Sequence, residues 1–87
     1  MKFGSVKALL HSNPLHSAGL PLVEIAGDQR VLVEGHEGVL GYDDTKVCVR
    51  LSFGAVEVCG CGLKIVNMTK AQLVIYGRIQ TVSMQRG

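Results

Sequence analysis

The chain is poor in aromatic and charged residues. It has no tryptophan, and two tyrosines and two phenylalanines bring its aromatic content to 5%. Proteins that bind single-stranded nucleic acids stack the bases on aromatic side chains, so this composition argues against such a surface. Charged residues make up 18% of the chain, against roughly 25% in an ordinary soluble domain, while hydrophobic residues reach 47%. We therefore expect some apolar side chains to be left outside one small core, where another copy or a partner would cover them.

The chain also lacks a strong charge of either sign and a long apolar run. Residues 20–87 carry seven acidic and seven basic side chains, so the net charge of +2 comes from Lys2 and Lys7. A neutral domain is a poor ligand for a phosphate backbone, which is held by clustered Lys and Arg. No stretch approaches the ~20 apolar residues that cross a bilayer. Ala8–Leu10 is also far shorter than the apolar part of a secretory signal. We therefore expect a cytoplasmic protein without a membrane span.

Residues that could carry chemistry are few and scattered. The three cysteines are an odd number, which argues against a closed disulfide framework. Cys59 and Cys61 are one pair, and Cys48 and His36 would have to complete the four ligands of a structural zinc site. We interpret the cysteines instead as small apolar strand residues in a reducing cytosol. No nucleophile stands beside a base, and no glycine-rich loop precedes a helix. We predict no catalytic residues, no metal site and no cofactor, and therefore no enzyme.

Alternation with a period of two dominates the chain from Leu20 onward. Val47, Val49 and Leu51, for example, alternate with Lys46, Cys48 and Arg50, which predicts a strand with its valines and leucine inward. Eight such segments are separated by turns rich in glycine, and they predict an all-β sandwich or small barrel of antiparallel strands, with a β-solenoid as the alternative. The segments are Pro21–Ala26, Arg30–Glu34, Val39–Tyr42, Lys46–Leu51, Ala55–Cys59, Leu63–Met68, Leu73–Tyr76 and Arg78–Met84.

The remaining local features are a tail and the turns. Residues 1–19 differ in composition, and we interpret them as a flexible tail in which residues 5–11 could form one or two helical turns. Residues 20–87 then form the domain. Asp43 and Asp44 are expected to cap backbone amides in a hairpin turn. Five glycines are expected to serve structural turns, because turns require positive φ or close backbone approach: Gly35, Gly38, Gly54, Gly62 and Gly77.

Several ordered segments between Leu22 and Met84 carry a resemblance to a known family. The segments are Val31-Leu32-Val33-Glu34-Gly35-His36-Glu37-Gly38-Val39-Leu40-Gly41-Tyr42-Asp43-Asp44, then Phe53-Gly54-Ala55-Val56-Glu57-Val58, Gly62-Leu63-Lys64-Ile65 and Leu73-Val74-Ile75-Tyr76-Gly77-Arg78-Ile79. In this order they resemble the YabP/YqfC family of sporulation proteins. That resemblance implies a role in endospore formation and in assembly of the spore coat or envelope. Members of the family are not known as enzymes.

One departure from the family suggests where this chain makes contacts. Relatives tend to be charge-rich on their outward face, whereas Cys48, Val74 and Tyr76 stand at outward positions here. We predict that these three residues contact other proteins and that the chain forms a homo-oligomer. The expected partners are other sporulation or spore-envelope proteins, including membrane-bound ones, at the mother-cell or forespore surface. A small nucleic-acid-binding barrel is the alternative, although the neutral charge and scarce aromatics count against nucleic acid as a partner.

Overall fold

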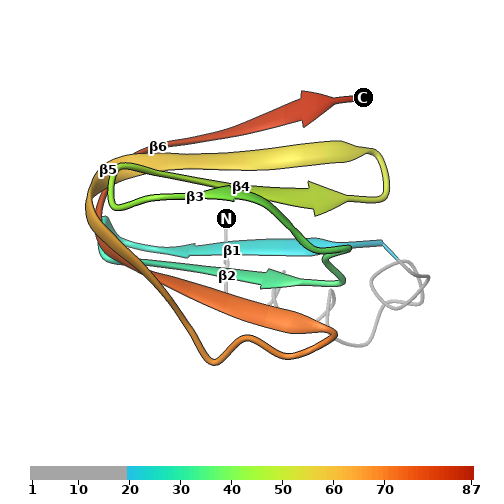
Figure 1. Ribbon diagram of the computed structural model, residues 1–87, viewed down its shortest axis with the longest axis horizontal. Coiled ribbons are helices and arrows are strands. Elements are labelled where there is room, and N and C mark those ends of the chain that lie inside the picture. The colour runs from blue at the N-terminus through green and yellow to red at the C-terminus, as the bar shows by residue number, and fades with distance from the viewer. Residues whose placement is uncertain (1–19) are drawn as a thin grey trace, which may run out of the picture.

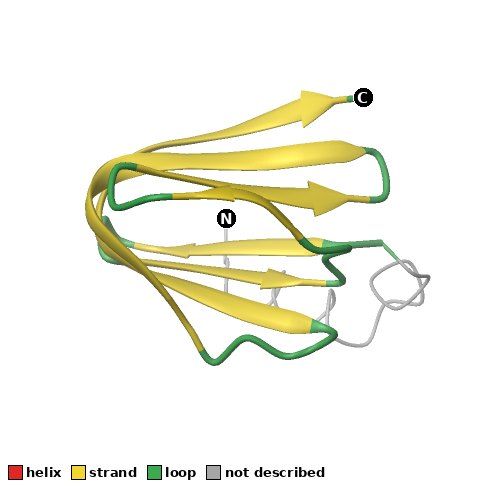
Figure 2. Cartoon of the chain, viewed as in Figure 1, coloured by secondary structure: helices red, strands yellow, loops and turns green. Residues whose placement is uncertain are grey.

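Six antiparallel strands form one open sheet in the computed structural model, which describes residues 20–87 (Figures 1 and 2). The order across the sheet is β1-β2-β6-β5-β4-β3. No helix occurs within these residues, and the all-β class predicted from the sequence is confirmed. The tail at residues 1–19, with its expected helical turns, lies outside the described residues. The strands are β1 (Leu22–Ala26), β2 (Arg30–Glu34), β3 (Val39–Tyr42), β4 (Lys46–Leu51), β5 (Gly54–Val66) and β6 (Gln72–Arg86).

The count of eight strands is wrong, because two expected breaks are bends inside long strands. β5 runs for 13 residues through Gly60 and Gly62, and β6 runs for 15 residues through Gly77. The two bends lie side by side in the β5–β6 ladder, where Gly60 is opposite Ile79 and Cys61 is opposite Arg78. The register shifts on both sides of this point, between Cys59 and Gly60 and between Cys61 and Lys64. Such irregularities increase strand bending, so the glycines turn the sheet without reversing the chain.

The bends divide the sheet into two halves that face each other (Figure 1). What we call the β4 half contains β3, β4, the first part of β5 and the last part of β6. What we call the β2 half contains β1, β2, the first part of β6 and the last part of β5. The strands of both halves belong to one hydrogen-bonded sheet with open edges, so residues 20–87 form neither two separate sheets nor a closed barrel.

The core lies between the two halves and takes alternate side chains from both. Val47, Val49 and Leu51 are buried, as their alternation predicts, while Cys48 between them faces outward. The β2 half contributes Val31, Val33, Leu73 and Ile75, and the β4 half contributes Val56 and Val58. Leu63 and Ile79 fill the region of the bends. The apolar face of a single bent sheet is thus covered by the sheet itself, which gives a short chain a core without a second layer.

Two of the turns supply backbone carbonyls to the bends. In the turn before β4, the Thr45 carbonyl accepts from Gly60 N at 3.0 Å and the Asp44 carbonyl accepts from Leu63 N at 2.9 Å. In the turn before β2, the carbonyls of Gln29 and Asp28 accept from Gly77 N and Ile79 N, at 3.2 and 2.7 Å. The backbone groups that lose regular partners at the register shifts are therefore paired again, as buried amides require.

The five glycines assigned to structural positions all have positive φ. Gly54, Gly62 and Gly77, however, belong to β5 and β6 rather than to loops between strands, so only Gly35 and Gly38 lie in connections. The values of φ are 79° at Gly35, 122° at Gly38, 152° at Gly54, 61° at Gly62 and 144° at Gly77.

Candidate protein-binding surface

The three predicted contact residues do not share one surface. Val74 and Tyr76 flank the buried Ile75 on β6, so they face outward from the β2 half. Cys48 lies between the buried Val47 and Val49 on β4, so it faces outward from the β4 half. The structure therefore places Val74 and Tyr76 together and puts Cys48 on the opposite side of the folded sheet.

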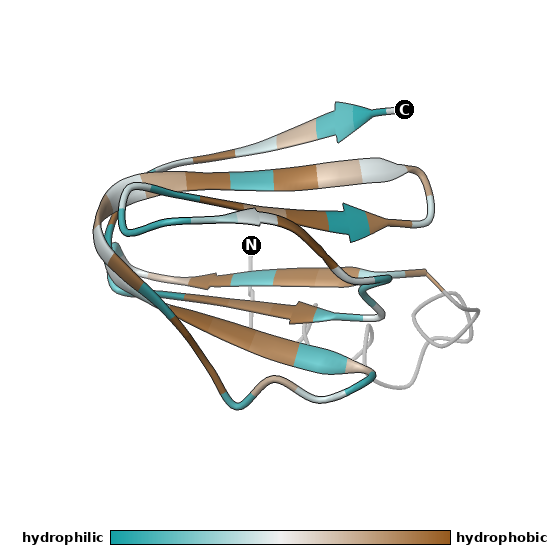
Figure 3. Ribbon diagram, viewed as in Figure 1, coloured by the Kyte–Doolittle hydropathy of each residue, from teal (hydrophilic) through white to brown (hydrophobic). Residues whose placement is uncertain are grey.

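Val74 and Tyr76 belong to two rows that cross the outer face of the β2 half. The first row is apolar and takes one residue from each of three adjacent strands, in the order Leu32, Val74, Val66. The first part of β6 is an apolar stretch of the ribbon (Figure 3), and Val74 belongs to this part of the strand. Only 9% of Val74 is exposed, while Leu32 and Val66 are half-buried. A row of this kind offers a narrow apolar contact rather than a large exposed patch.

The second row combines an aromatic ring with two cations. Tyr76 is 43% exposed, and its cross-strand neighbours are Arg30 on β2 and Lys64 on β5, both exposed. Tyrosine and arginine are enriched at the centres of protein interfaces, because both combine apolar area with hydrogen-bonding groups. We call these two rows together the outer face: Leu32, Val66, Val74, Arg30, Lys64 and Tyr76.

An open hollow of about 390 Å³ adjoins the second row at the bend of β6. It is lined by Tyr76, Gly77 and Arg78 from β6 and by Asp28 and Gln29 from the β1–β2 turn. One carboxylate and one guanidinium therefore stand in the same depression. Tyr76 contributes to both features, so a partner resting on the outer face could place a polar side chain in the hollow.

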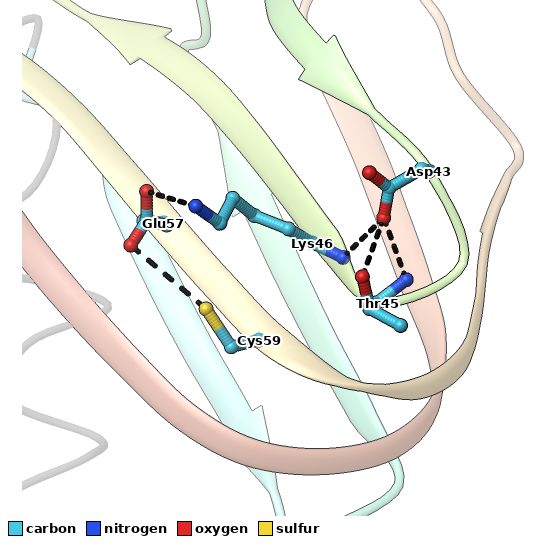
Figure 4. Close-up of polar contacts among 5 residues, drawn as sticks. All are labelled: Asp43, Thr45, Lys46, Glu57 and Cys59. Atoms are coloured by element: carbon cyan, nitrogen blue, oxygen red, sulfur yellow. Dashed lines mark hydrogen bonds and ion pairs between the residues drawn. The ribbon is translucent and has the colours of Figure 1, made fainter.

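The opposite side of the sheet, around Cys48, is polar. Lys46 Nζ pairs with Glu57 Oε2 at 3.8 Å, and the Cys59 thiol donates to Glu57 Oε1 at 3.8 Å (Figure 4). Glu57 is also the cross-strand neighbour of Cys48. All three cysteines are free thiols. In the part of the chain that the structure describes, no three His, Cys, Asp or Glu side chains gather so that they could hold a metal ion.

His36 and Asp43 serve the backbone of connecting segments. Gly38 N donates to His36 Nδ1 at 3.1 Å, so Nε2 carries the ring proton and donates to the Thr69 carbonyl at 2.8 Å. The His36 ring therefore joins the β2–β3 and β5–β6 connections.

Asp43 caps the next hairpin turn (Figure 4). Its Oδ1 accepts from Thr45 N, Thr45 Oγ1 and Lys46 N at 2.8, 2.8 and 2.9 Å. These hydrogen bonds favour the ionised carboxylate, with the bond from the Thr45 amide contributing most, and they lower the pKa of Asp43. The capping role predicted from the sequence is thus present at Asp43.

The family comparison matches the whole of the described region. The model of the YabP family covers residues 20–87, which is more than three quarters of the chain. The chain belongs to the YabP family. The resemblance seen in its glycine-bounded strands is confirmed, and membership is consistent with a role associated with sporulation. No curated protein and no solved structure matches the chain.

The sequence does not predict every neighbour on this candidate surface. Alternation alone put Leu32 on the side away from Val31 and Val33, but it did not show that Leu32 lies beside Val74. That neighbourhood depends on the strand order, in which β6 lies between β2 and β5. Asp28 and Arg78 carry no local signal of a shared hollow either, because they are 50 residues apart in sequence.

Proposed function

We propose that this YabP-family protein is a non-catalytic adaptor in endospore formation that binds other sporulation or spore-envelope proteins through its outer face. The observation that carries the proposal is the apolar row Leu32–Val74–Val66 beside the exposed Tyr76. Family membership supplies the sporulation context. The site of action in this proposal is the cytoplasmic side of the mother cell or the forespore surface. Within residues 20–87 there is no helix of the length and apolar character that crossing a membrane demands.

The charges around Tyr76 indicate the chemistry of the partner. Arg30 and Lys64 are both exposed and stand on either side of the ring. A segment with apolar side chains for the first row and a carboxylate for the second would match both rows. Burial of apolar area contributes roughly 25 cal/mol per Å², and the complementary charges favour the correct orientation of the partner. The proposed function also includes self-association of the chain.

A non-catalytic role is supported by what the polar side chains do. Both ring nitrogens of His36 are engaged with backbone atoms, and one carboxylate oxygen of Asp43 receives three hydrogen bonds within its own turn. These side chains organise connections, and binding is then left to the faces and edges of the sheet.

The test replaces Tyr76 in the spore-forming bacterium that carries the gene. Tyr76→Glu puts a carboxylate into the centre of the outer face, and we expect it to reduce the yield of heat-resistant spores to that of a deletion strain. Leu40→Glu is the matched control, because Leu40 is 53% exposed on β3 in the other half. We expect Leu40→Glu to sporulate like the parent, and immunoblots must show equal amounts of all three proteins.

Two results would contradict the proposal. A deletion strain that forms heat-resistant spores at the parental level would remove the sporulation role. A Tyr76→Glu strain that sporulates normally while the deletion strain fails would keep that role but move the contact away from the outer face.

A further inference from the structure

The sheet leaves four stretches of strand edge without a neighbouring strand among the described residues. Two are the outermost strands, β1 and β3. The third is the last part of β5, which pairs with β6 alone, because β4 ends its pairing at Cys59. The fourth is the last part of β6, because β2 pairs only with residues 72–76 of that strand. Edges of this kind present backbone donors and acceptors that another strand can pair with.

Three of these four edges carry features that discourage pairing. β1 follows Pro21 and carries the charged Glu24. β3 has four residues and a register shift between Val39 and Gly41. The last part of β5 is short and carries the exposed Lys64. Short length, charge, proline and bulges are the usual protections of an edge strand. Residues 80–85 of β6 contain none of the charged residues or prolines that provide such protection, and the nearest charge is Arg86.

The register shows which backbone groups of β6 face this edge. Gly87 N donates to the Phe53 carbonyl at 3.0 Å, and the directly opposite pairs continue from there as Gln85 with Ala55 and Ser83 with Glu57. Hydrogen-bonded pairs recur at every second residue of an antiparallel ladder. Thr81, Ser83 and Gln85 therefore bond to β5, and the N–H and C=O groups of Val82 and Met84 point to the open edge.

The side chains along the edge alternate between apolar and polar in the same register. Val82 is opposite Val58 and Met84 is opposite Val56, so both lie on the inner, apolar face. Met84 is nevertheless 53% exposed, because no strand beyond it among residues 20–87 covers its outer side. Thr81, Ser83 and Gln85 are polar, and their side chains lie on the side of the β4 half that faces away from the core.

We propose that a second copy of this chain pairs with this edge, antiparallel, through residues 80–86 of β6 about a two-fold axis at Ser83. Val82 then faces Met84 of the partner subunit on the inner side, and Thr81 faces Gln85 of the partner subunit on the outer side. Ser83 meets Ser83 of the partner subunit on the axis. Apolar pairs with apolar and polar with polar along the whole segment, and the free N–H and C=O groups of Val82 and Met84 gain partners. The six-stranded sheet continues across the dimer.

This dimer develops the self-association included in the proposed function, but it uses a different surface from the outer face. The two can therefore fail separately. Tyr76→Glu is expected to abolish partner binding and to leave the dimer intact. A substitution in residues 80–86 of β6 is expected to dissociate the purified dimer and to leave partner binding by each outer face intact.

Cysteine cross-linking tests the register directly. Ser83→Cys is made in a background in which Cys48, Cys59 and Cys61 are serine. Residues on the axis form a pair without backbone hydrogen bonds, about 4.5 Å apart at Cα, which is within reach of a disulfide. We expect mild oxidation to convert most of the protein to a covalent dimer.

Two variants in the same background serve as controls. Thr81→Cys alone is expected to stay monomeric on denaturing gels, because its copies lie about 13 Å apart. A mixture of Thr81→Cys and Gln85→Cys chains is expected to cross-link, because those positions face each other.

Val82→Pro tests the edge in solution. The Val82 N–H has no partner within the described fold, so proline removes an intermolecular donor without removing a bond of the β5–β6 ladder. We expect the parent to be a dimer by light scattering at about 100 µM. We expect the dissociation constant of the variant dimer to be at least about tenfold higher than that of the parent. Circular dichroism checks that the variant is folded, and Ser83→Lys, which places two like charges on the axis, gives a second perturbation.

Three results would overturn the proposal. The first is a parent that is monomeric at that concentration. The second is a dimer that survives both Val82→Pro and Ser83→Lys. The third is cross-linking of Thr81→Cys alone at the efficiency of Ser83→Cys.

Discussion

The bend of β6 at Gly77 gives the sharpest prediction about stability. Gly77 has a φ of 144°, and a Cβ built on it would lie 2.8 Å from the Gly62 carbonyl oxygen and 2.9 Å from Leu63 Cα. Both are atoms of the backbone of β5, which has little room to move. For Gly77→Ala, the unusual backbone conformation costs about 1–3 kcal/mol. The crowding adds about 1–3 kcal/mol.

That loss is large compared with the stability of the domain. At about 0.05–0.15 kcal/mol per residue, a domain of this size has a free energy of unfolding of about 3–10 kcal/mol. Gly77→Ala therefore removes between a fifth and all of it. Each kcal/mol shifts the melting temperature of such a domain by roughly 4–8 °C, so we expect a decrease of about 10 °C or more in a thermal melt followed by circular dichroism.

Gly38→Ala separates the two costs. Gly38 has a similar φ of 122°, but a Cβ there would meet no atom within 4 Å. It therefore carries the conformational cost alone, and Gly77→Ala should melt about 4 °C or more below it. Gly60→Ala is the converse case, because Gly60 has an ordinary φ while its Cβ would collide with the Arg78 carbonyl. If Gly77→Ala melted together with Gly38→Ala, the close contact between the two bends would be refuted.

Three further predictions concern single side chains. The lowered pKa of Asp43 contributes stability that is fully present above the unfolded value of about 3.9 and is lost as the pH falls through the folded value; Asp43→Ala should therefore lower the melting temperature at pH 7 and flatten its decrease in acid. His36→Ala should accelerate amide hydrogen exchange at Gly38, measured by NMR, because that amide donates to the ring. Among the three thiols, the exposed Cys61 should react first with a thiol reagent, and equal labelling of all three in the native protein would contradict their different burial.

The sequence predicts those strands well whose limits are set by local chemistry. Arg30–Glu34, Val39–Tyr42 and Lys46–Leu51 were bounded correctly, because turn residues such as Asp43 stop the alternation where the strand stops. The prediction fails at the bends, because the inward side chains change there from even-numbered to odd-numbered residues. Val58 is inward on even numbering and Leu63 on odd numbering, although both belong to β5. A register shift absorbs this change in the structure, whereas in the sequence it is identical to a turn between two strands.

The candidate surface was predictable only in part, for a related reason. The outward positions of Val74 and Tyr76 follow from alternation around Ile75. Their neighbours follow from the strand order, which brings Leu32 and Val66 to either side of Val74. Cys48 shares with them only the property of facing outward. Period-two reasoning cannot tell which of two outer faces a residue occupies once the sheet folds over on itself.

One strand connects the two proposed surfaces. The first part of β6 carries Val74 and Tyr76, the bend follows at Gly77, and the last part offers the edge around Ser83. Because the bend lies between them, pairing at the edge leaves the outer face uncovered in both copies. A two-fold dimer then presents two identical outer faces, each able to hold a partner. Bivalent attachment raises the effective affinity for partners arrayed on a surface, even where each single contact is weak. A narrow apolar row with one exposed tyrosine is a weak contact of this kind, so the edge of β6 and the outer face are more useful together than either is alone.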